Sequence, residues 1–190
     1  MILPILSYVK SVLKEKDQLV SVKINKLKRL IDNMWETMYA AQGVGLAAPQ
    51  IGESKRLFIV DTYPFSDNED LSTGERKFLK SFKMVFINPE IVKENGKECV
   101  FSEGCLSIPG IREDVKRKET IIIKFQDLNG KFIKESFSGI AARVIQHEYD
   151  HIEGVLFTDK LSYLKKKTIK RKLTEISTGK IKVDYSMKFL

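Results

Sequence analysis

Histidine and cysteine are scarce in this chain. Its 190 residues include two histidines, His147 and His151, and two cysteines, Cys99 and Cys105. Two cysteines are too few for a disulfide framework, so the sequence excludes a small disulfide-stapled domain and favours reduced thiols. Because histidine is so rare here, the placement of both histidines within five residues needs an explanation.

Long apolar segments are also missing. No stretch approaches the roughly 18–20 apolar residues that a membrane span requires. The start of the chain, MILPILSYVK, has too short an apolar run for a secretory signal and lacks the basic segment that precedes one. We therefore expect a cytoplasmic protein that does not associate with membranes.

Acidic residues are nearly missing from the C-terminal part. Residues 160–190 contain ten basic and two acidic residues, so this tail carries the +8 net charge of the whole chain. A basic tail can draw a protein toward a polyanion such as the ribosome, although a solvated helix face that aids solubility is the simpler interpretation. No aromatic residues are interleaved for base stacking, so we expect no sequence-specific nucleic-acid binding.

The rest of the composition is that of an ordinary globular domain. Hydrophobic residues make up 43% and charged residues 31% of the chain. A chain of 190 residues can bury one core without disulfides. We predict a single catalytic domain over residues 1–190, in which residues 160–190 form a basic C-terminal helix and tail.

The first regular element predicted from residue spacing is an amphipathic helix. Apolar residues recur at helical intervals over residues 24–42, and Gly43 stands where a C-terminal cap would lie. The segment that follows, GVGLAAPQIG (43–52), is bracketed by glycines, which indicates a loop or an edge segment rather than a helix.

The middle of the chain has the features of strands. Residues 56–62 and 84–92 are apolar enough for buried strands, and Pro89 indicates an edge or a bend. Residues 63–81 between them are polar, and we predict a loop there. Residues 119–137 predict a β-hairpin, because two β-rich runs flank Asn129-Gly130, a dipeptide typical of a type I′ turn.

Two helices are predicted to complete the chain. Apolar spacing indicates a helix over 138–154, with Ser138 as its N-terminal cap and Gly154 at its end. A final helix is expected around 160–177. Strands in the middle without alternating β and α units predict an α+β fold, with mixed or antiparallel sheets packed around a central metal-binding helix and with N-terminal and C-terminal helices.

Both histidines lie in QHEYDH (146–151), within the predicted central helix. A spacing of four residues places both imidazoles on one face of a helix, where they can bind one metal ion. Glu148 lies near enough to reach a water molecule at that ion and to act as a base. The pattern His-Glu-x-x-His therefore predicts a metal site with a catalytic carboxylate, with chance occurrence as the alternative.

Two histidines leave such a site incomplete. No histidine follows them, Glu153 is too close on the same helix, and Glu175 lies in the basic tail. Upstream, Cys105 in EGCLSIPG offers a thiolate, which is a good ligand for zinc or ferrous iron. A buried, unreactive cysteine is the alternative, and it is the interpretation that we prefer for Cys99.

Three segments, taken together, resemble the signature motifs of the peptide deformylase family, in the family's order. They are GVGLAAPQ (43–50), EGCLS (103–107) and QHEYDH (146–151). The resemblance extends over about residues 1–165 and leaves out the tail, and the segment 63–81 is longer than in compact members. It implies a metal-dependent hydrolase that removes the N-formyl group from the N-terminal formyl-methionine of nascent polypeptides and releases formate.

The resemblance also implies roles for single residues. The metal ligands would be Cys105, His147 and His151. Glu148 would take a proton from a water molecule and deliver it to the leaving amine. Gln50 and the backbone N–H of Leu106 would stabilise the oxyanion of the tetrahedral intermediate.

The substrate would bind along the same motifs. Gly45 lies in a segment that resembles the one that pairs with the substrate backbone as an added strand, which needs an exposed edge. The other residues expected to contact the substrate are Val44, Phe101, Glu103, Gly104, Arg112, Ile140 and Val144. Asp150 would pair with a cation such as Arg117 and so fix the helix beneath the ligands.

The metal ion is inferred from the resemblance and not from the ligands. Two histidines and one cysteine suit zinc. The resemblance instead implies one Fe²⁺ ion in the cell, with Zn²⁺, Ni²⁺ or Co²⁺ able to substitute. A ferrous thiolate site is expected to be sensitive to oxygen and peroxide.

Two other functions stay open at this point. A zinc endopeptidase would need a further ligand downstream, which the sequence does not supply. A non-catalytic protein that docks on ribosomes through its basic tail would be expected to have lost at least one residue with a chemical role. Every such residue is present here.

Overall fold

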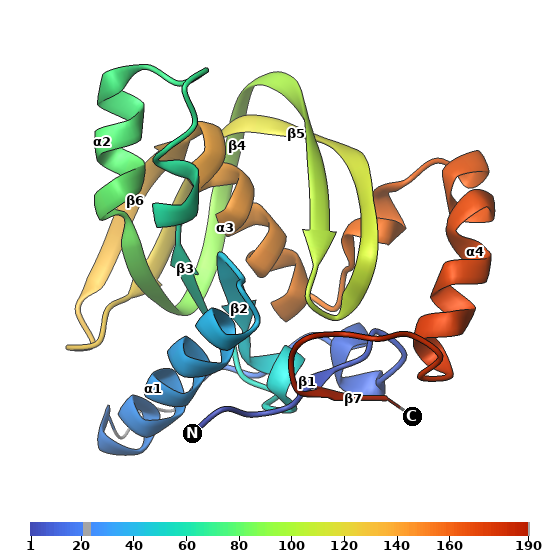
Figure 1. The fold of residues 1–190 in the computed structure, drawn as a ribbon. Helices are drawn as coiled ribbons and strands as arrows, with labels where there is room; N and C mark the ends of the chain where they lie inside the picture. The colour runs from blue at the N-terminus through green and yellow to red at the C-terminus, as the bar shows by residue number, and fades with distance from the viewer. Residues whose placement is uncertain (21–23, 190) are drawn as a thin grey trace.

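A computed structural model of the chain describes residues 1–20 and 24–189 (Figure 1). Residues 21–23 and Leu190, the last residue of the predicted basic tail, lie outside the described part. The predicted α+β class is confirmed: helices pack against a five-stranded sheet, and a separate pair of short strands joins the two ends of the described chain.

The five-stranded sheet has the order β2-β3-β4-β5-β6, and every neighbouring pair is antiparallel. The strands are β2 (Gly45–Ala47), β3 (Leu57–Asp61), β4 (Lys83–Cys105), β5 (Ile108–Gln126) and β6 (Phe132–Ser138). β3 is buried along its whole length, as its apolar sequence predicts. The predicted edge segment is confirmed, because β2 forms one edge of the sheet.

β4 and β5 extend far beyond the predicted strands, and their paired outer halves form a long twisted hairpin (Figure 1). Residues 93–98 (KENGKE) contain no apolar side chain, and this hid the strand pattern. Pro89 was predicted to mark an edge or a bend, and the register of the β4–β5 pair is irregular there, with a shift between Ile87 and Glu90. The hairpin ends at Cys105 and Ile108, which carries the cysteine of the EGCLS motif back toward the core.

The loop predicted for residues 63–81 is wrong. The segment contains the 3₁₀ turn η3 (Tyr63–Phe65) and the helix α2 (Thr73–Ser81). Ser72 caps α2, and Glu75 bonds back to Ser72, so the capping pair Ser-x-x-Glu marks this helix in the sequence.

The hairpin between β5 and β6 is confirmed, but the predicted type I′ turn is wrong. Such a turn needs positive φ at both central residues, whereas Gly130 (φ 76°) has it and Asn129 does not. The loop is longer, because the Asp127 side chain accepts hydrogen bonds from the backbone of Asn129 and Lys131.

The predicted helices are present, but the caps expected at Gly43 and Ser138 are not formed as predicted. α1 (Ile24–Ala40) ends where Gln42, and not Gly43, takes the left-handed conformation (φ 55°). α3 (Gly139–Ile152) begins after Ser138, but the Ser138 side chain makes no capping hydrogen bond. α4 (Tyr163–Ser177) is capped by Ser162.

α3 is held against the sheet by an aromatic core. It contacts β2, β3, β5 and β6. The rings of Phe58, Phe86 and Phe125 pack at centroid distances of 4.7 and 4.5 Å, and the buried face of α3 closes this cluster with Ala141 and Ala142. Small side chains allow the helix backbone to approach closely, so the positions of the residues on its other face are set by packing.

The two ends of the described chain meet in a parallel pair that residue patterns did not predict. β1 (Ile5–Leu6) pairs with β7 (Met187–Lys188). Two-residue strands carry no detectable periodicity. None of the helices in the described ranges is both long and apolar enough to cross a membrane.

Asp17 is a buried acid at the C-terminal end of α3. Its side chain is almost inaccessible to solvent, its backbone N–H donates to the Ile152 carbonyl at 2.9 Å, and its carboxylate oxygens have no hydrogen-bond partner among the described residues. Burial raises the pKa of Asp17 to about 6, and the nearby Ser54 side chain and the charge of Arg56 offset this only in part.

The raised pKa gives folding a pH dependence. The unfolded chain releases this proton near the ordinary aspartate pKa of about 3.9, whereas the folded chain holds it to about pH 6. The folded state binds more protons between these values, so this group lowers stability as the pH rises through that window.

Replacing Asp17 by asparagine should therefore stabilise the protein at high pH. We expect Asp17→Asn to raise the free energy of unfolding by roughly 1–2 kcal/mol at pH 8 and to change it little at pH 4. Chemical denaturation at both pH values measures this, with Asp32→Asn on the exposed face of α1 as the control. An equal gain at both pH values would contradict the assignment.

Candidate metal centre and adjoining cavity

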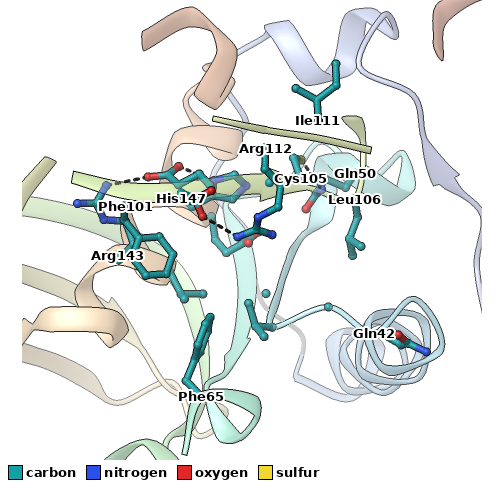
Figure 2. Close-up of a pocket in the computed structure, with 18 of the residues that line it drawn as sticks. Gln42, Gln50, Phe65, Phe101, Cys105, Leu106, Ile111, Arg112, Arg143 and His147 are labelled. Carbon is teal, nitrogen blue, oxygen red and sulfur yellow. Dashed lines mark hydrogen bonds and ion pairs between the residues drawn. The ribbon is translucent and has the colours of Figure 1, made fainter. Parts of the chain in front are cut away.

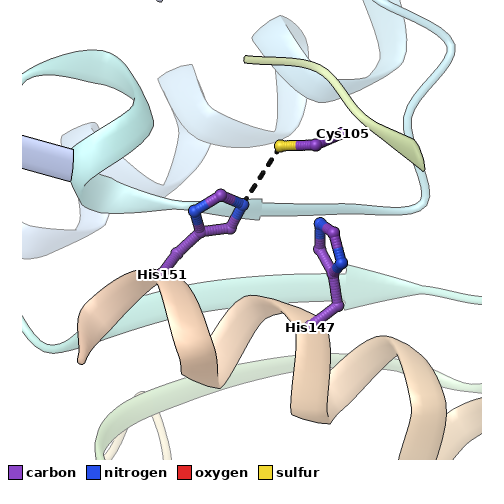
Figure 3. A group of neighbouring side chains, drawn as sticks. All are labelled: Cys105, His147 and His151. Atoms are coloured by element: carbon purple, nitrogen blue, oxygen red, sulfur yellow. Dashed lines mark hydrogen bonds between the residues drawn. The ribbon is translucent and has the colours of Figure 1, made fainter. Parts of the chain in front are cut away.

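The predicted metal ligands converge. His147 and His151 project from one face of α3 toward Cys105 at the end of β4 (Figure 3). The possible ligand atoms of the three residues lie within 4.8 Å of one another, and the Cys105 Sγ is 3.2 Å from the His151 Nε2. Ligands of one tetrahedral ion at ordinary bond lengths lie about 3.5 Å apart. The donor set and its spacing therefore fit a divalent metal ion.

The orientation of His147 is set by a buried carboxylate. Its Nδ1–H donates to the Glu103 Oε2 at 2.9 Å, which leaves Nε2 for the metal site. Arg117 binds both oxygens of Glu103, at 2.7 and 2.8 Å, and Arg143 donates to one at 3.0 Å. Burial alone would raise the pKa of Glu103, but the hydrogen bonds from Arg117 and His147 outweigh it and hold this pKa well below its usual range.

Glu103 was predicted to contact the substrate, and this stays a prediction. It borders the cavity, but its side chain is almost inaccessible to solvent, and His147 and two arginines surround its oxygens. Its carboxylate therefore orients His147, one of the predicted metal ligands.

The predicted pair of Asp150 and Arg117 is present. Arg117 donates to the Asp150 Oδ2 at 2.6 Å, and the Lys160 ammonium lies 3.2 Å from the same oxygen. Arg117 therefore joins Asp150 on α3 to Glu103 on β4. This bridge fixes the helix that carries the histidines to the strand that carries Cys105.

Glu148 lies under the edge strand β2. Its side chain is buried, and its Oε2 has no hydrogen-bond partner among the described residues. A Cβ atom at Gly45 would lie 2.4 Å from the Glu148 Oε1, so glycine is required at this position for the strand to pass the carboxylate. Burial raises the pKa of Glu148 to about 7, partly offset by the charge of His147. A carboxyl group with such a pKa can both take up and release a proton near neutral pH.

Gln50 presents its amide nitrogen to the site. It lies in the 3₁₀ turn η2 (Ala48–Ile51), and its Oε1 accepts a hydrogen bond from the Ala47 backbone at 2.8 Å. The Nε2 then donates to the Cys105 Sγ at 3.5 Å and to the Ser107 Oγ at 3.2 Å. The bond from Ala47 fixes which end of the amide faces the site.

A cavity of about 400 Å³ opens beside these residues (Figure 2). The structure brings most of the predicted site residues to its wall. They are Val44, Gly45, Gln50, Phe101, Glu103, Gly104, Cys105, Leu106, Arg112, Val144, His147 and Glu148. Arg112 is exposed and donates to the Ser102 carbonyl at 2.6 Å.

Ile140 was predicted to line the pocket for the methionine side chain, and the structure places it elsewhere. It is not among the residues of the cavity wall and packs against the aromatic core.

Sequence reasoning missed Phe65 and Arg143 at the cavity wall. Phe65 comes from η3 and meets Phe101 edge to face at a centroid distance of 6.2 Å, and the Arg143 guanidinium lies 5.6 Å from the centre of the same ring (Figure 2). Arg143 lies four residues before His147, so helical spacing could have placed it on the site face. Nothing in the polar segment 63–81 marks Phe65. Gln42 and Ile111 also border the cavity.

Known proteins are similar to this chain in sequence and in fold. The family model described as polypeptide deformylase matches residues 2–167. Peptide deformylases of Christiangramia forsetii and Flavobacterium johnsoniae are 57% and 56% identical over 189 residues, which is 100% of this chain and 96% of each relative. The crystal structure of a peptide deformylase from Legionella pneumophila has a TM-score of 0.80 at 39% identity and covers 95% of this chain and 98% of its own.

Removing the thiol at the end of β4 should remove the metal. We expect Cys105→Ala to lower the metal content from about one ion per chain to near zero, because two histidines alone bind an ion weakly. Elemental analysis of the dialysed protein measures this. Cys99→Ala is the matched control, because Cys99 is exposed and lies outside the ligand group. Retention of the metal by Cys105→Ala would show that Cys105 is not a ligand.

Proposed function

The chain belongs to the peptide deformylase family, and we propose that it hydrolyses the N-formyl group of N-terminal formyl-methionine on nascent polypeptides and releases formate. One observation carries the proposal: the ligand group Cys105, His147 and His151 adjoins a cavity whose wall combines a buried carboxylate, an amide donor and apolar side chains. A site of this kind suits hydrolysis of an amide next to an apolar side chain.

The metal ion would be held by Cys105, His147 and His151. When bound, it supplies a Lewis acid that polarises the formyl carbonyl and lowers the pKa of a water molecule. We propose Fe²⁺ in the cell, with Zn²⁺, Ni²⁺ or Co²⁺ as substitutes. Thiolate and imidazole ligands accept each of these ions, and the family likeness favours iron.

Glu148 would move the proton. Hydrolysis adds water to the formyl carbon and breaks the C–N bond, so one proton must pass from the water to the departing amine nitrogen. Glu148 is buried beside the ligands, and its Oε2 has no partner among the residues that the structure describes. The close approach at Gly45 leaves no space for the carboxylate to swing toward β2.

Gln50 and the backbone N–H of Leu106 would stabilise the negative charge on the former carbonyl oxygen. The Gln50 Nε2 already points at the ligand atom of Cys105 and carries no charge, so it donates without competing as a base. Leu106 directly follows Cys105 in the turn between β4 and β5.

The peptide would bind as an added strand along β2. β2 pairs with β3 on one side and forms the edge of the described sheet on the other. Main-chain hydrogen bonds at such an edge hold a peptide whatever its sequence. The methionine side chain would then enter the cavity between Val44, Phe101 and Val144, with Phe65 closing the wall, and Arg112 stands at the exposed rim.

The exposed face of α4 is the proposed contact with the ribosome. Ile169 and Ile176 are buried on one side of this helix, and the lysines of the opposite side are exposed. Formylated chains emerge at the ribosome, whose RNA attracts basic surfaces. Because this proposed substrate emerges at the ribosome, it also supports a cytoplasmic location for the protein.

The proton-transfer role of Glu148 predicts a specific defect. We expect Glu148→Gln to keep the metal but to lower kcat for formate release from formyl-Met-Ala-Ser by about 10²–10⁴, because the amide cannot accept the proton. The assay is run anaerobically, with elemental analysis of the same sample. An acetylated peptide and an unformylated protein are the control substrates.

Three results would contradict the proposals. Near wild-type turnover by Glu148→Gln would remove the proposed proton path. Cleavage of the unformylated protein would favour an endopeptidase. Full activity of a sample that contains only zinc would remove iron from the proposal.

The proposed ribosome contact predicts a salt-dependent interaction. Replacing Lys167, Lys170 and Lys172 on α4 by glutamine should weaken co-sedimentation with ribosomes by roughly tenfold or more at low salt. The matched control replaces three exposed lysines away from α4 by glutamine, Lys77, Lys80 and Lys134. Equal losses in the two variants would show that the surface charge acts only through solubility or net charge.

A further inference from the structure

The end of the chain returns to the metal centre. The family model stops at residue 167, but the structure continues through α4, turns at Gly179 (φ 68°) and runs back across the molecule (Figure 1). There β7 pairs with β1, and the Tyr185 hydroxyl donates a hydrogen bond to the Leu106 carbonyl at 2.7 Å. Leu106 follows the ligand Cys105 directly.

The turn that Tyr185 contacts has an unfavourable shape for a tight hairpin. Leu106 and Ser107 alone connect β4 to β5, and Cys105 faces Ile108 across the pair. Two-residue hairpin turns normally need positive φ at one or both positions to match the strand twist. Neither Leu106 nor Ser107 has positive φ, and the register shifts between Gly104 and Cys105. The Ser107 N–H donates to the Cys105 Sγ at 3.4 Å within the hairpin, and contacts from outside the hairpin also hold this turn in place.

Such contacts hold Ser107 and Leu106 separately. The Ser107 carbonyl accepts from the Tyr8 backbone N–H at 3.1 Å, and the Ser107 hydroxyl accepts from Gln50 at 3.2 Å. The Leu106 carbonyl accepts from Tyr185. The two carbonyls of the turn are thus held by segments near the two ends of the chain.

We propose that Tyr185 is a positioning residue: by holding the Leu106 carbonyl, it restrains the adjoining peptide unit that carries the Leu106 N–H and so helps to aim this N–H for transition-state binding. The hydroxyl fixes the carbonyl on one side of Leu106, and the thiolate ligand Cys105 fixes the chain on the other. The backbone N–H lies in the Cys105–Leu106 peptide unit between these two anchors, and both anchors limit its rotation. A donor that is aimed before the reaction begins needs no reorganisation when charge develops on the substrate oxygen. This inference rests on the proposed function.

The position of the Tyr185 ring is itself well determined. The Ile5 N–H donates to the Ser186 carbonyl at 2.9 Å, and the Ser7 N–H donates to the Lys188 carbonyl at 3.0 Å. The ring packs against the hydrophobic cluster that also contains Leu46 and Leu106. Backbone pairing and side-chain packing together place the hydroxyl at the turn.

Tyr185→Phe tests the proposal, because it removes the hydroxyl and keeps the ring. We expect kcat for formate release from a formyl-methionyl peptide to fall about three- to tenfold, the factor associated with one neutral hydrogen bond. KM and metal content should stay within about twofold of wild type, because the substrate ground state and the ligands are untouched. The backbone amide of Leu106 should exchange faster with deuterium.

Tyr8→Phe is the matched control. Its hydroxyl also donates to a backbone carbonyl, that of Leu173 at 3.1 Å on α4, and its backbone bond to Ser107 survives the substitution. We expect a similar change in Tm for both variants and a loss of kcat in Tyr185→Phe alone. Unchanged kcat in Tyr185→Phe, or equal losses in both variants, would overturn the proposal.

The exchange measurement separates this inference from the proposed function. If the wild-type protein releases no formate, the proposed function fails, while faster exchange at Leu106 in Tyr185→Phe alone would still support the positioning role. Equal exchange at Leu106 in wild type and Tyr185→Phe would overturn it whatever the activity.

Discussion

The geometry of the metal centre depends on one buried carboxylate. Glu103 receives hydrogen bonds from Arg117, Arg143 and His147, and its side chain has almost no contact with solvent. Burying this carboxylate without its cationic partners would lower the stability of the folded protein by about 3–5 kcal/mol. The folded structure therefore requires Glu103 and its partners to lie together. Because Glu103 lies on β4 two residues before Cys105, the same interaction that selects the metal-facing nitrogen of His147 also sets the distance between α3 and the thiolate.

Gln146 and Tyr149, the remaining residues of QHEYDH, hold α3 on its face away from the cavity. The Gln146 Nε2 donates to Glu94 on β4 at 2.8 Å. Tyr149 packs under the Arg56 guanidinium at 5.6 Å, and Arg56 forms an ion pair with Glu153 at 2.6 Å. α3 is therefore fixed on the face away from the cavity as well as on the ligand face. A reactive constellation needs this rigidity, because small displacements of a ligand or a base lower the rate sharply.

Patterns within one segment, together with the three motifs, predicted the metal ligands and the pair of Asp150 and Arg117. They did not locate residues whose positions depend on how unmarked segments fold. The spacing of His147 and His151 implied a shared face, and the search for a third ligand led to Cys105. Phe65 was missed because its position depends on how residues 63–81 fold over β4. The long β4–β5 hairpin was missed because the outer part of β4 is mostly exposed and polar, although β5 buries Ile111 and Val115. The close contact of Gly45 with Glu148 requires two elements in register, and no single-segment pattern contains that information.

The C-terminal helix α4 is strongly basic on one face and packed against apolar residues on the other. The many lysines of this part of the chain predicted a solvated helix, and most lysines of α4 are indeed exposed. Ile169 and Ile176, however, bury the other face of α4 against the cluster that contains Ile108 and Val115 of β5. Burying two isoleucines contributes about 3–6 kcal/mol, more than the mutual repulsion of screened surface charges removes. The helix can therefore remain strongly basic and still anchor the segment that follows it, and that segment carries Tyr185 back to the turn after Cys105.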